Sequence, residues 1–343
     1  MTISLDSIPR FGAADVLDAA RETFGIAGRV SALPSERDQN FLIADPRRGR
    51  FVLKIANLED SAALLDFQHQ AMRRVSSSRC GARVPEIVRS LAGADVETIR
   101  SRTGAEYRMR VLTWIDGRVL ADYKPRGAPL LESIGACMAQ VDASLESYTH
   151  PAMHRVLQWD LRHAGLARRQ AWLLPGPWRA RAEEAFGRWE EVDWASLRHG
   201  VIHGDANDHN VLVDGRRMTG LLDFGDMVHS ATVCELAVAL AYAMLGERDP
   251  LEAAAAVIRG YHRHHPLTEP EQLVLYPLIH ARLAASLCYA AHNKERNPGD
   301  PYQVVTEAAA RQLIVLLEGY SNDAVRRVIR EACRPAITPN RPP

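Results

Sequence analysis

The chain has 343 residues, of which 47% are hydrophobic and 24% charged, and its 42 Lys and Arg residues balance 42 Asp and Glu residues. This is the composition of a water-soluble globular protein with room for one large domain or two of moderate size. Because there is no net charge, a broad attraction to nucleic acid or to an anionic membrane is not expected.

The cysteine pattern and the N-terminus predict a cytoplasmic protein. The cysteines are odd in number, far apart and without a C-x-x-C pair, so reduced thiols are expected. The first residues include Asp6 and contain no long apolar run, so no signal peptide is predicted. The apolar stretch 236–245 is too short to span a bilayer. The cysteines are Cys80, Cys137, Cys234, Cys288 and Cys333.

The first third of the chain predicts a small antiparallel sheet with two helices. Apolar residues recur at helical spacing between Val16 and Phe24, and again over residues 58–76. Short β-branched and aromatic runs bounded by Gly, Pro and Asp predict strands. These strands are expected at 29–33, 41–44, 50–55, 84–100 and 107–113.

One of these strands carries a lysine among apolar residues. Phe51-Val52-Leu53-Lys54-Ile55 resembles the V-A-I-K strand of protein kinases, whose Lys holds nucleotide phosphates. A buried lysine is costly without a partner. Lys54 is therefore predicted to bind phosphate, with a solvent-facing lysine on an edge strand as the alternative.

The loop before this strand, residues 33–41, contains no glycine, so its backbone amides are not expected to approach phosphates as a Gly-rich loop does. Ser35, Arg37 and Asn40 are candidates to contact phosphates through their side chains. A polar turn between two strands explains the segment equally well.

Kinases also pair this lysine with a Glu on the following helix. Here the corresponding stretch offers Gln68 and Gln70, with Asp66 just before them. Gln68 can accept a hydrogen bond from Lys54 but cannot neutralise its charge, so the usual ion pair is in question.

The run from Tyr107 into Asp116-Gly117 predicts the last strand of this region and a domain boundary. Backbone groups around Leu112 and Trp114 are expected to face a nucleotide base, although Trp114 fits a core position equally well. The predicted division is 1–115, 116–335 and a tail at 336–343, with disorder expected from residue 335.

Beyond this boundary helical periodicity dominates. Glu235 lies in the first turn of a helix that is apolar nearly all round, where it complements the helix dipole or forms a buried hydrogen bond. Recognition of a cationic substrate by Glu235 is the weaker alternative. The run 262–265 is interpreted as basic residues at a helix C-terminus rather than a metal site. Helices are predicted at 129–145, 178–192, 232–245, 253–262, 269–292 and 304–320.

The segments 201–213 and 220–226 contain the densest cluster of polar residues between apolar runs. Asp205 and Asn210 are five residues apart, and Asp223 follows thirteen residues later. The turn Asp214-Gly215 lies between two apolar runs and predicts a hairpin. Such a hairpin brings Asp223 back beside Asn210.

This arrangement suits phosphoryl transfer, which needs a carboxylate for the attacking hydroxyl and oxygen ligands for Mg²⁺. Asp205 is the predicted base, and Asn210 and Asp223 are the predicted metal ligands. His203 is expected to brace the loop through hydrogen bonds. The additional acids Asp208 and Asp226 suit an acceptor that carries an amine, or cap turns.

A D-x-x-x-x-N loop followed by D-F-G is the arrangement of protein kinases. With His203-Gly204-Asp205 in place of His-Arg-Asp, the chain resembles the aminoglycoside phosphotransferase and choline kinase superfamily. The resemblance implies an α+β, protein-kinase-like fold with two lobes, a small antiparallel β-sheet N-lobe and a mainly helical C-lobe.

Further segments resemble hydroxylysine kinases and the phosphotransferase domain fused to class III aminotransferases. The resemblance covers roughly residues 30 to 320 and implies an amino-alcohol or amino-acid acceptor. It implies GTP as the donor in hydroxylysine kinases, but the sequence leaves ATP and GTP both open. The segments are 35–41, 112–114, 159–161, 223–229 and 234–237.

Three alternatives remain at this level. The first is a kinase for homoserine, choline, ethanolamine, an aminoglycoside or a sugar. The second is a nucleotide-binding regulatory pseudokinase, favoured by the unusual loop and the missing helix Glu. The third is a metal-dependent hydrolase using His203, Asp205 and His209. The oligomeric state is open in each case.

Overall fold

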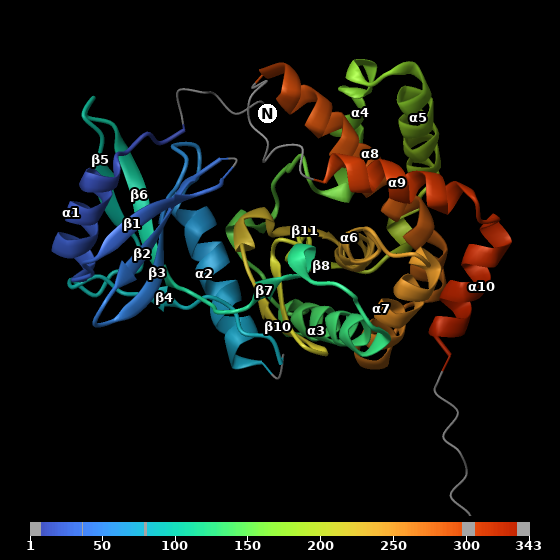
Figure 1. The fold of residues 1–343 in the computed structure, drawn as a ribbon, viewed down its shortest axis with the longest axis horizontal. Helices are drawn as coiled ribbons and strands as arrows, with labels where there is room; N and C mark the ends of the chain where they lie inside the picture. The colour runs from blue at the N-terminus through green and yellow to red at the C-terminus, as the bar shows by residue number, and fades with distance from the viewer. Residues whose placement is uncertain (1–7, 36, 79–80, 297–305, 335–343) are drawn as a thin grey trace, which may run out of the picture. The chain divides into compact units, whose positions relative to one another are not determined.

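The computed structural model describes residues 8–35, 37–78, 81–296 and 306–334 and divides into two compact units (Figure 1). The first unit comprises the chain up to Ser77 together with Arg83–Asp116 and His150–Met153. The second comprises Ser78–Ala82, Gly117–Thr149 and the chain from His154 onward. The predicted tail and Cys80 lie outside the described residues.

The first unit is built on an antiparallel sheet, as predicted. Its strand order is β1-β2-β3-β6-β4, and β5 pairs with the other end of β6. The long central strands β3 and β6 are adjacent, with Lys54 opposite Arg110. The strands are β1 (Arg29–Leu33), β2 (Gln39–Asp45), β3 (Gly49–Ile55), β4 (Ile87–Val88), β5 (Glu97–Arg100) and β6 (Glu106–Thr113).

The region 84–100, where strand was predicted, contains the two short strands β4 and β5 with a turn between them instead of continuous strand. Gly93 adopts a φ of +86° in this turn, and its N–H donates to Ser90 O. The Ser90 hydroxyl also accepts the Ala94 N–H. A left-handed glycine and a serine that bonds to nearby backbone groups end an extended strand.

Helices α1 (Ala13–Phe24) and α2 (Ala62–Ser77) complete the first unit. Helix α2 begins later than predicted because the residues before it form a capped turn. Asn57 Oδ1 accepts the Glu59 N–H, and Ser61 Oγ accepts the Leu64 N–H. Asn and Ser side chains stabilise turns and helix N-termini in this way.

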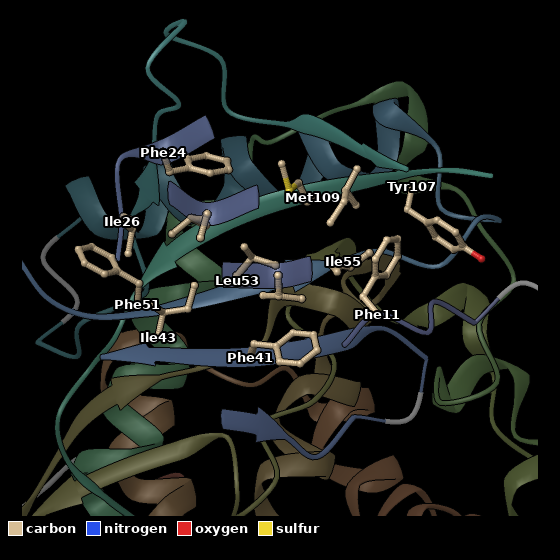
Figure 2. Packing of buried hydrophobic residues seen from close by; sticks show 14 residues of the cluster. Phe11, Phe24, Ile26, Phe41, Ile43, Phe51, Leu53, Ile55, Tyr107 and Met109 are labelled. Carbon is tan, nitrogen blue, oxygen red and sulfur yellow. The ribbon is translucent and has the colours of Figure 1, made fainter. Parts of the chain in front are cut away.

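A hydrophobic core fills the first unit between α1 and the sheet (Figure 2). Alternate residues of β2 and β3 contribute to it, as the alternation of side chains along a strand requires, namely Phe41 and Ile43 and then Phe51, Leu53 and Ile55. Phe24 and Ile26, on either side of the left-handed Gly25, contribute from the end of α1. The strand residues labelled in Figure 2 are Phe41, Ile43, Phe51, Leu53, Ile55, Tyr107 and Met109.

The second unit is mainly helical, as predicted. Its helix α6 is buried along its whole length, which explains a sequence that is apolar on every face. Helix α7 begins earlier than predicted because Asp249 accepts the Glu252 N–H and caps it. The helices are α3 (Ala128–Leu145), α4 (Gly165–Arg168), α5 (Gly176–Glu190), α6 (Val233–Ala243), α7 (Pro250–His264), α8 (Glu269–Arg296), α9 (Glu307–Glu318) and α10 (Asn322–Ala332).

Short strands carry the polar cluster of the second unit. Strands β9 (Val211–Asp214) and β10 (Arg217–Leu221) form the predicted hairpin, with Gly215 at a φ of +56° in its turn. Strand β7 (Arg118–Val119) extends this sheet beside β9. A second antiparallel pair joins β8 (His199–Ile202) to β11 (Val228–Ala231), a pairing that the sequence analysis did not include.

Helix α8 is also, among the described residues, the one that is long and apolar enough to cross a membrane. However, 78% of its apolar window is buried inside the protein. Length and composition alone do not separate a membrane span from a buried core helix, and burial of this extent is what a core helix shows.

Candidate active site

The loop that follows β8 depends on a glycine. Gly204 has a φ of +79°, and a Cβ built at this position would lie 2.9 Å from Asp226 O. Residues with a side chain rarely adopt this backbone conformation, and here the space is also taken. The close approach brings the segment that ends in Asp226 against the loop that carries Asp205.

Asp205 is held by two amides that also come from this loop. Its Oδ2 accepts Asn207 Nδ2 at 2.9 Å and Asn210 Nδ2 at 2.8 Å. Asn207 Oδ1 in turn accepts the N–H groups of His209 and Asn210. The loop therefore fixes its own shape and the orientation of the Asp205 carboxylate together.

The other oxygen of Asp205 is bound by a residue that sequence reasoning missed. Arg282, on α8, donates from Nη2 to Asp205 Oδ1 at 3.0 Å. Arg282 is 2% exposed, whereas the Asp205 side chain is 18% exposed. An arginine inside a long apolar helix was the available signal, because a buried guanidinium requires an anionic partner.

Burial raises the pKa of the Asp205 carboxyl well above its usual range. The Arg282 guanidinium works against this shift, while the charges of Asp226 and Asp223 add to it. The site therefore gathers several acids around one carboxylate, with one buried cation directly on it.

His203 lies under this loop with no exposed surface and bridges two segments. Its Nε2 lies 3.0 Å from Leu222 O, and its Nδ1 accepts the Asp205 N–H at 3.3 Å. Burial lowers the pKa of His203 to about 4, so its ring is neutral at pH 7. A neutral ring with both nitrogens engaged has the geometry of a brace, the role expected from the sequence.

The hairpin brings Asp223 beside Asn210, since the Leu222 N–H donates to Asn210 O at 2.8 Å. Asp223 itself has a φ of 54° and is, among the described residues, the one non-glycine with a positive φ. Its Oδ1 accepts the Gly225 N–H at 3.0 Å. Residues held in such sparsely populated backbone conformations cluster at active sites, ligand clamps and switch regions.

These residues fit a divalent cation of the Mg²⁺ type. Because the Asn210 amide nitrogen donates to Asp205 O and Oδ2, the amide is oriented and its oxygen is directed elsewhere. Asn210 and Asp223 therefore offer an amide and a carboxylate oxygen, which are ligands that Mg²⁺ prefers.

The structure gives less support to the alternative hypothesis of a metal-dependent hydrolase. No cluster of three or more His, Cys, Asp or Glu side chains suited to hold a metal occurs in the described part of the chain. His203 and Asp205 are both used in the contacts given above. A metal centre built on His203, Asp205 and His209 is therefore not formed.

Glu235 takes the buried role that the sequence favoured. It has no exposed surface, and its Oε2 accepts the Gly204 N–H at 2.9 Å. Burial raises the pKa of Glu235 to about 7. Its bond to the Gly204 N–H stabilises the turn before Asp205.

Asp208 is also turned into the protein. It is 5% exposed, lies 3.9 Å from the buried Arg126, and its carbonyl accepts the Ala121 N–H. These contacts favour the structural role that the sequence analysis left open. Asp226 differs, because it is half-buried and near enough to Asp205 to influence its pKa.

In the first unit, Lys54 is 7% exposed and its Nζ lies 4.0 Å from Asp38 Oδ2. Gln68 is buried and, within the described residues, its Oε1 has no hydrogen-bond partner, so the bond considered between Gln68 and Lys54 is not formed. The sequence analysis missed Asp38 as a partner for Lys54. This acid lies in the glycine-free loop itself.

The candidate phosphate contacts of that loop differ in their surroundings. Ser35 is exposed, whereas Arg37 donates to Asp60 Oδ1 at 2.9 Å. Asn40 is 8% exposed, and no partner for its Oδ1 occurs in the described residues. Of the three, Ser35 is thus the one placed at the surface.

Leu112 and Trp114, which were expected to face a nucleotide base, make most of their contacts within the first unit. Leu112 lies in β6 between Val52 and Ile87. The Trp114 N–H donates to Arg50 O, and its indole Nε1 donates to Asp116 Oδ1 at 3.2 Å. A base that used the Trp114 N–H would have to displace the first of these bonds.

Comparisons with known proteins assign the chain to a family. The profile described as the phosphotransferase enzyme family matches residues 29–273. The chain belongs to this family. It is also similar to hydroxylysine kinase of Danio rerio, with 30% identity over 94% of this chain and 96% of the relative. Hydroxylysine kinase of Mus musculus is 27% identical over 95% and 94% of the two chains.

Solved structures confirm the predicted kinase-like fold. A microcompartment-associated aminopropanol kinase superposes with a TM-score of 0.70, covering 92% of this chain and 99% of its own, at 17% identity. With the family match, this establishes a two-lobed α+β fold and a phosphotransferase that acts on the alcohol group of a small molecule.

Proposed function

We propose that this phosphotransferase transfers the γ-phosphoryl group of ATP or GTP to the hydroxyl of 5-hydroxylysine or a closely similar amino acid or amino alcohol. The observation that carries the proposal is the joining of Asp205, Asn210 and Asp223 by the loop and the hairpin. The similarity to hydroxylysine kinases over nearly the whole chain supports the choice of acceptor.

In this proposal Asp205 orients the acceptor hydroxyl and takes its proton. The amides of Asn207 and Asn210 keep Oδ2 in place, so the carboxylate does not have to be ordered when the acceptor binds. His203 and Glu235 support the backbone on which Asp205 is carried.

Asn210 and Asp223 would hold Mg²⁺, which neutralises phosphate charge when it is bound. Lys54 would bind the α- and β-phosphates, exchanging its contact with Asp38 for a phosphate oxygen. Ser35 is the residue of its loop best placed to add a hydrogen bond, because it is exposed.

The proposed acceptor carries amines, and acids near the base suit this charge. Asp226 is half-buried beside Asp205, whereas Asp208 and Glu235 are turned into the protein. Asp226 is therefore the residue proposed to recognise an acceptor amine. We propose a cytoplasmic location because Cys234, Cys288 and Cys333 are buried as free thiols.

A coupled assay of nucleoside diphosphate release tests the function. ATP and GTP are each combined with 5-hydroxylysine, homoserine, aminopropanol, choline, ethanolamine and an aminoglycoside in the presence of Mg²⁺. We expect release that depends on 5-hydroxylysine. Release with choline or the aminoglycoside alone would contradict the proposed acceptor, and tight Mg²⁺-dependent nucleotide binding with no release for any acceptor would favour a regulatory role.

A further inference from the structure

Arg282 is buried and contacts both the catalytic loop and aromatic side chains. It comes from the middle of α8, far along the chain from the catalytic loop, and is 2% exposed. Its Nη2 donates to Asp205 Oδ1 at 3.0 Å and to the Tyr242 hydroxyl at 3.3 Å, while its Nη1 donates to Trp159 O at 3.2 Å. One planar group thus joins the catalytic loop to two aromatic residues.

The same guanidinium is stacked on aromatic rings. Its Cζ lies 4.6 Å from the Trp159 ring centroid and 5.4 Å from the Tyr242 ring centroid. Trp159 is supported by Tyr289, whose ring centroid lies 4.7 Å away and whose hydroxyl donates to Gln158 O. Trp and Tyr faces bind cations, and arginine suits such a site because its guanidinium is flat and weakly hydrated.

Together these contacts fix the base on both sides. The two amides hold Oδ2 of Asp205, and Arg282 holds Oδ1. Since Arg282 is itself fixed by Trp159 and Tyr242, the Asp205 carboxylate has little freedom to rotate. A catalytic group must be held within about half an ångström of its productive position, because small misplacements cost large factors in rate.

We propose that Arg282 is a positioning residue that orients Asp205 for proton transfer and does not contribute to nucleotide binding. This inference rests on the proposed phosphotransfer to a small-molecule hydroxyl. Arg282 acts through Asp205, and the aromatic pair Trp159 and Tyr242 is the cradle that keeps its guanidinium in place.

The proposal predicts a defined pattern in the variant Arg282→Ala. We expect kcat with 5-hydroxylysine to fall by about 100-fold, while the KM for the nucleotide stays within about threefold of the wild-type value. Arg282→Lys keeps the charge but loses the flat two-sided contact, so it should recover only part of the lost kcat.

The cradle also predicts chemical rescue. With the side chain removed and the aromatic faces left intact, guanidinium chloride at about 20 mM, far below unfolding concentrations, should raise kcat of Arg282→Ala at least fivefold. Urea, which has a similar shape but no charge, should not. Arg168→Ala is the matched control, since Arg168 bonds Glu183 and Glu190 away from the loop, and it should show neither loss nor rescue.

The outcomes distinguish a failure of the proposed function from a failure of the positioning role of Arg282. A wild-type protein that is inactive with every acceptor contradicts the proposed function and removes the positioning role with it. An active wild type with unchanged kcat in Arg282→Ala, or rescue by urea as well as guanidinium, contradicts the positioning role alone. If Arg282→Ala does not fold, Arg282→Lys decides: a wild-type melting temperature with a wild-type kcat overturns the proposal.

Discussion

Asp205 receives more hydrogen bonds than an exposed loop carboxylate needs, from Asn207, Asn210 and Arg282. In Asp205→Asn the shape is kept but the proton acceptor is lost, so we expect turnover to fall by at least 10³-fold. Because Asp205 is proposed to contact the acceptor and not the phosphates, nucleotide affinity should change little. Steady-state turnover and nucleotide titration measure the two effects, and near-normal turnover would exclude Asp205 as the base.

Asp223 has a positive φ. The substitution Asp223→Asn tests the role of its charge without changing this backbone conformation. Asn also tolerates a positive φ and can accept the Gly225 N–H, so Asp223→Asn should keep the melting temperature. It loses the charge proposed to hold Mg²⁺, so Mg²⁺-dependent nucleotide affinity should fall at least tenfold. Unchanged affinity measured by calorimetry would count against Asp223 as a metal ligand.

Glu235 makes the stability of the loop depend on pH. Its pKa is raised by burial to about 7 in the folded chain, from 4.5, so the unfolded chain releases this proton at lower pH. The free energy of unfolding therefore falls as pH rises from about 4.5 to 7, and the loss is complete above 7. The shift corresponds to about 3 kcal/mol.

Glu235→Gln tests this pH dependence, because Gln can accept the Gly204 N–H without being charged. We expect the variant to be more stable than the wild type above pH 7 and to lose this advantage as the pH approaches 4.5. Denaturant unfolding at a series of pH values measures the difference. A difference that does not vary with pH would contradict the account of Glu235.

The spacing of Asp205, Asn210 and Asp223 could be interpreted from the sequence because local turns bring them together. Arg282 and Asp38 could not be found in the same way. Arg282 reaches Asp205 from a helix 77 residues along the chain, and such a contact follows from packing, not from spacing. The strain at Asp223 is likewise a property of the folded backbone.

Helices α3 and α7 approach closely at two glycines. A Cβ at Gly260 would lie 1.9 Å from Glu132 O, and one at Gly135 would lie 1.9 Å from Val257 O. A methyl group at either position forces the helices apart. Since Ser133 of α3 bonds the Met218 N–H of β10, this packing also supports the hairpin that leads to Asp223.

Gly260→Ala should therefore destabilise the protein by about 1–3 kcal/mol or more. Gly187→Ala is the matched control, because Gly187 lies within α5 and has no atom within 4 Å of its built Cβ. There alanine should stabilise the protein by about 0.5–1 kcal/mol. Equal effects of the two substitutions in thermal unfolding would contradict the close packing of α3 and α7.

For helices and strands, the sequence predicted their presence more accurately than their first and last residues. The hairpin was predicted because Asp214-Gly215 is a strong turn signal between apolar runs. The first residues of α2 and α7, Ala62 and Pro250, were not predicted because they depend on capping side chains. The pairing of β8 with β11 was not predicted because it depends on tertiary contact. Helix α10 was included only in a generally helical region.

For the whole molecule, the two-lobed fold was predicted from the resemblance of the motifs at Asp205, Asn210 and Asp223 to those of kinases, and the charge balance indicated only that nucleic acid and anionic membranes are not attracted. The identity of the nucleotide was beyond the sequence, since the strand end at Leu112 and Trp114 has no side-chain pattern that selects a base. A nucleotide that binds the folded chain raises its stability by about 2.7 kcal/mol at one hundred times its Kd.

The melting temperature measured with ATP and with GTP therefore shows which of the two nucleotides the protein binds. We expect the melting temperature to rise by several degrees with one nucleotide at saturation, only when Mg²⁺ is present, and the rise to be clearly smaller in Asp223→Asn. An equal rise without Mg²⁺ would contradict the proposed metal ligands.

In the proposed reaction Asp205 orients the hydroxyl of 5-hydroxylysine and takes its proton, and this hydroxyl receives the γ-phosphoryl group. ³¹P nuclear magnetic resonance of the reaction mixture tests it most directly, because a phosphomonoester is resolved from inorganic phosphate. We expect a new phosphomonoester signal with the wild type and none with Asp205→Asn. Inorganic phosphate as the sole product, or the same ester signal with Asp205→Asn, would contradict it.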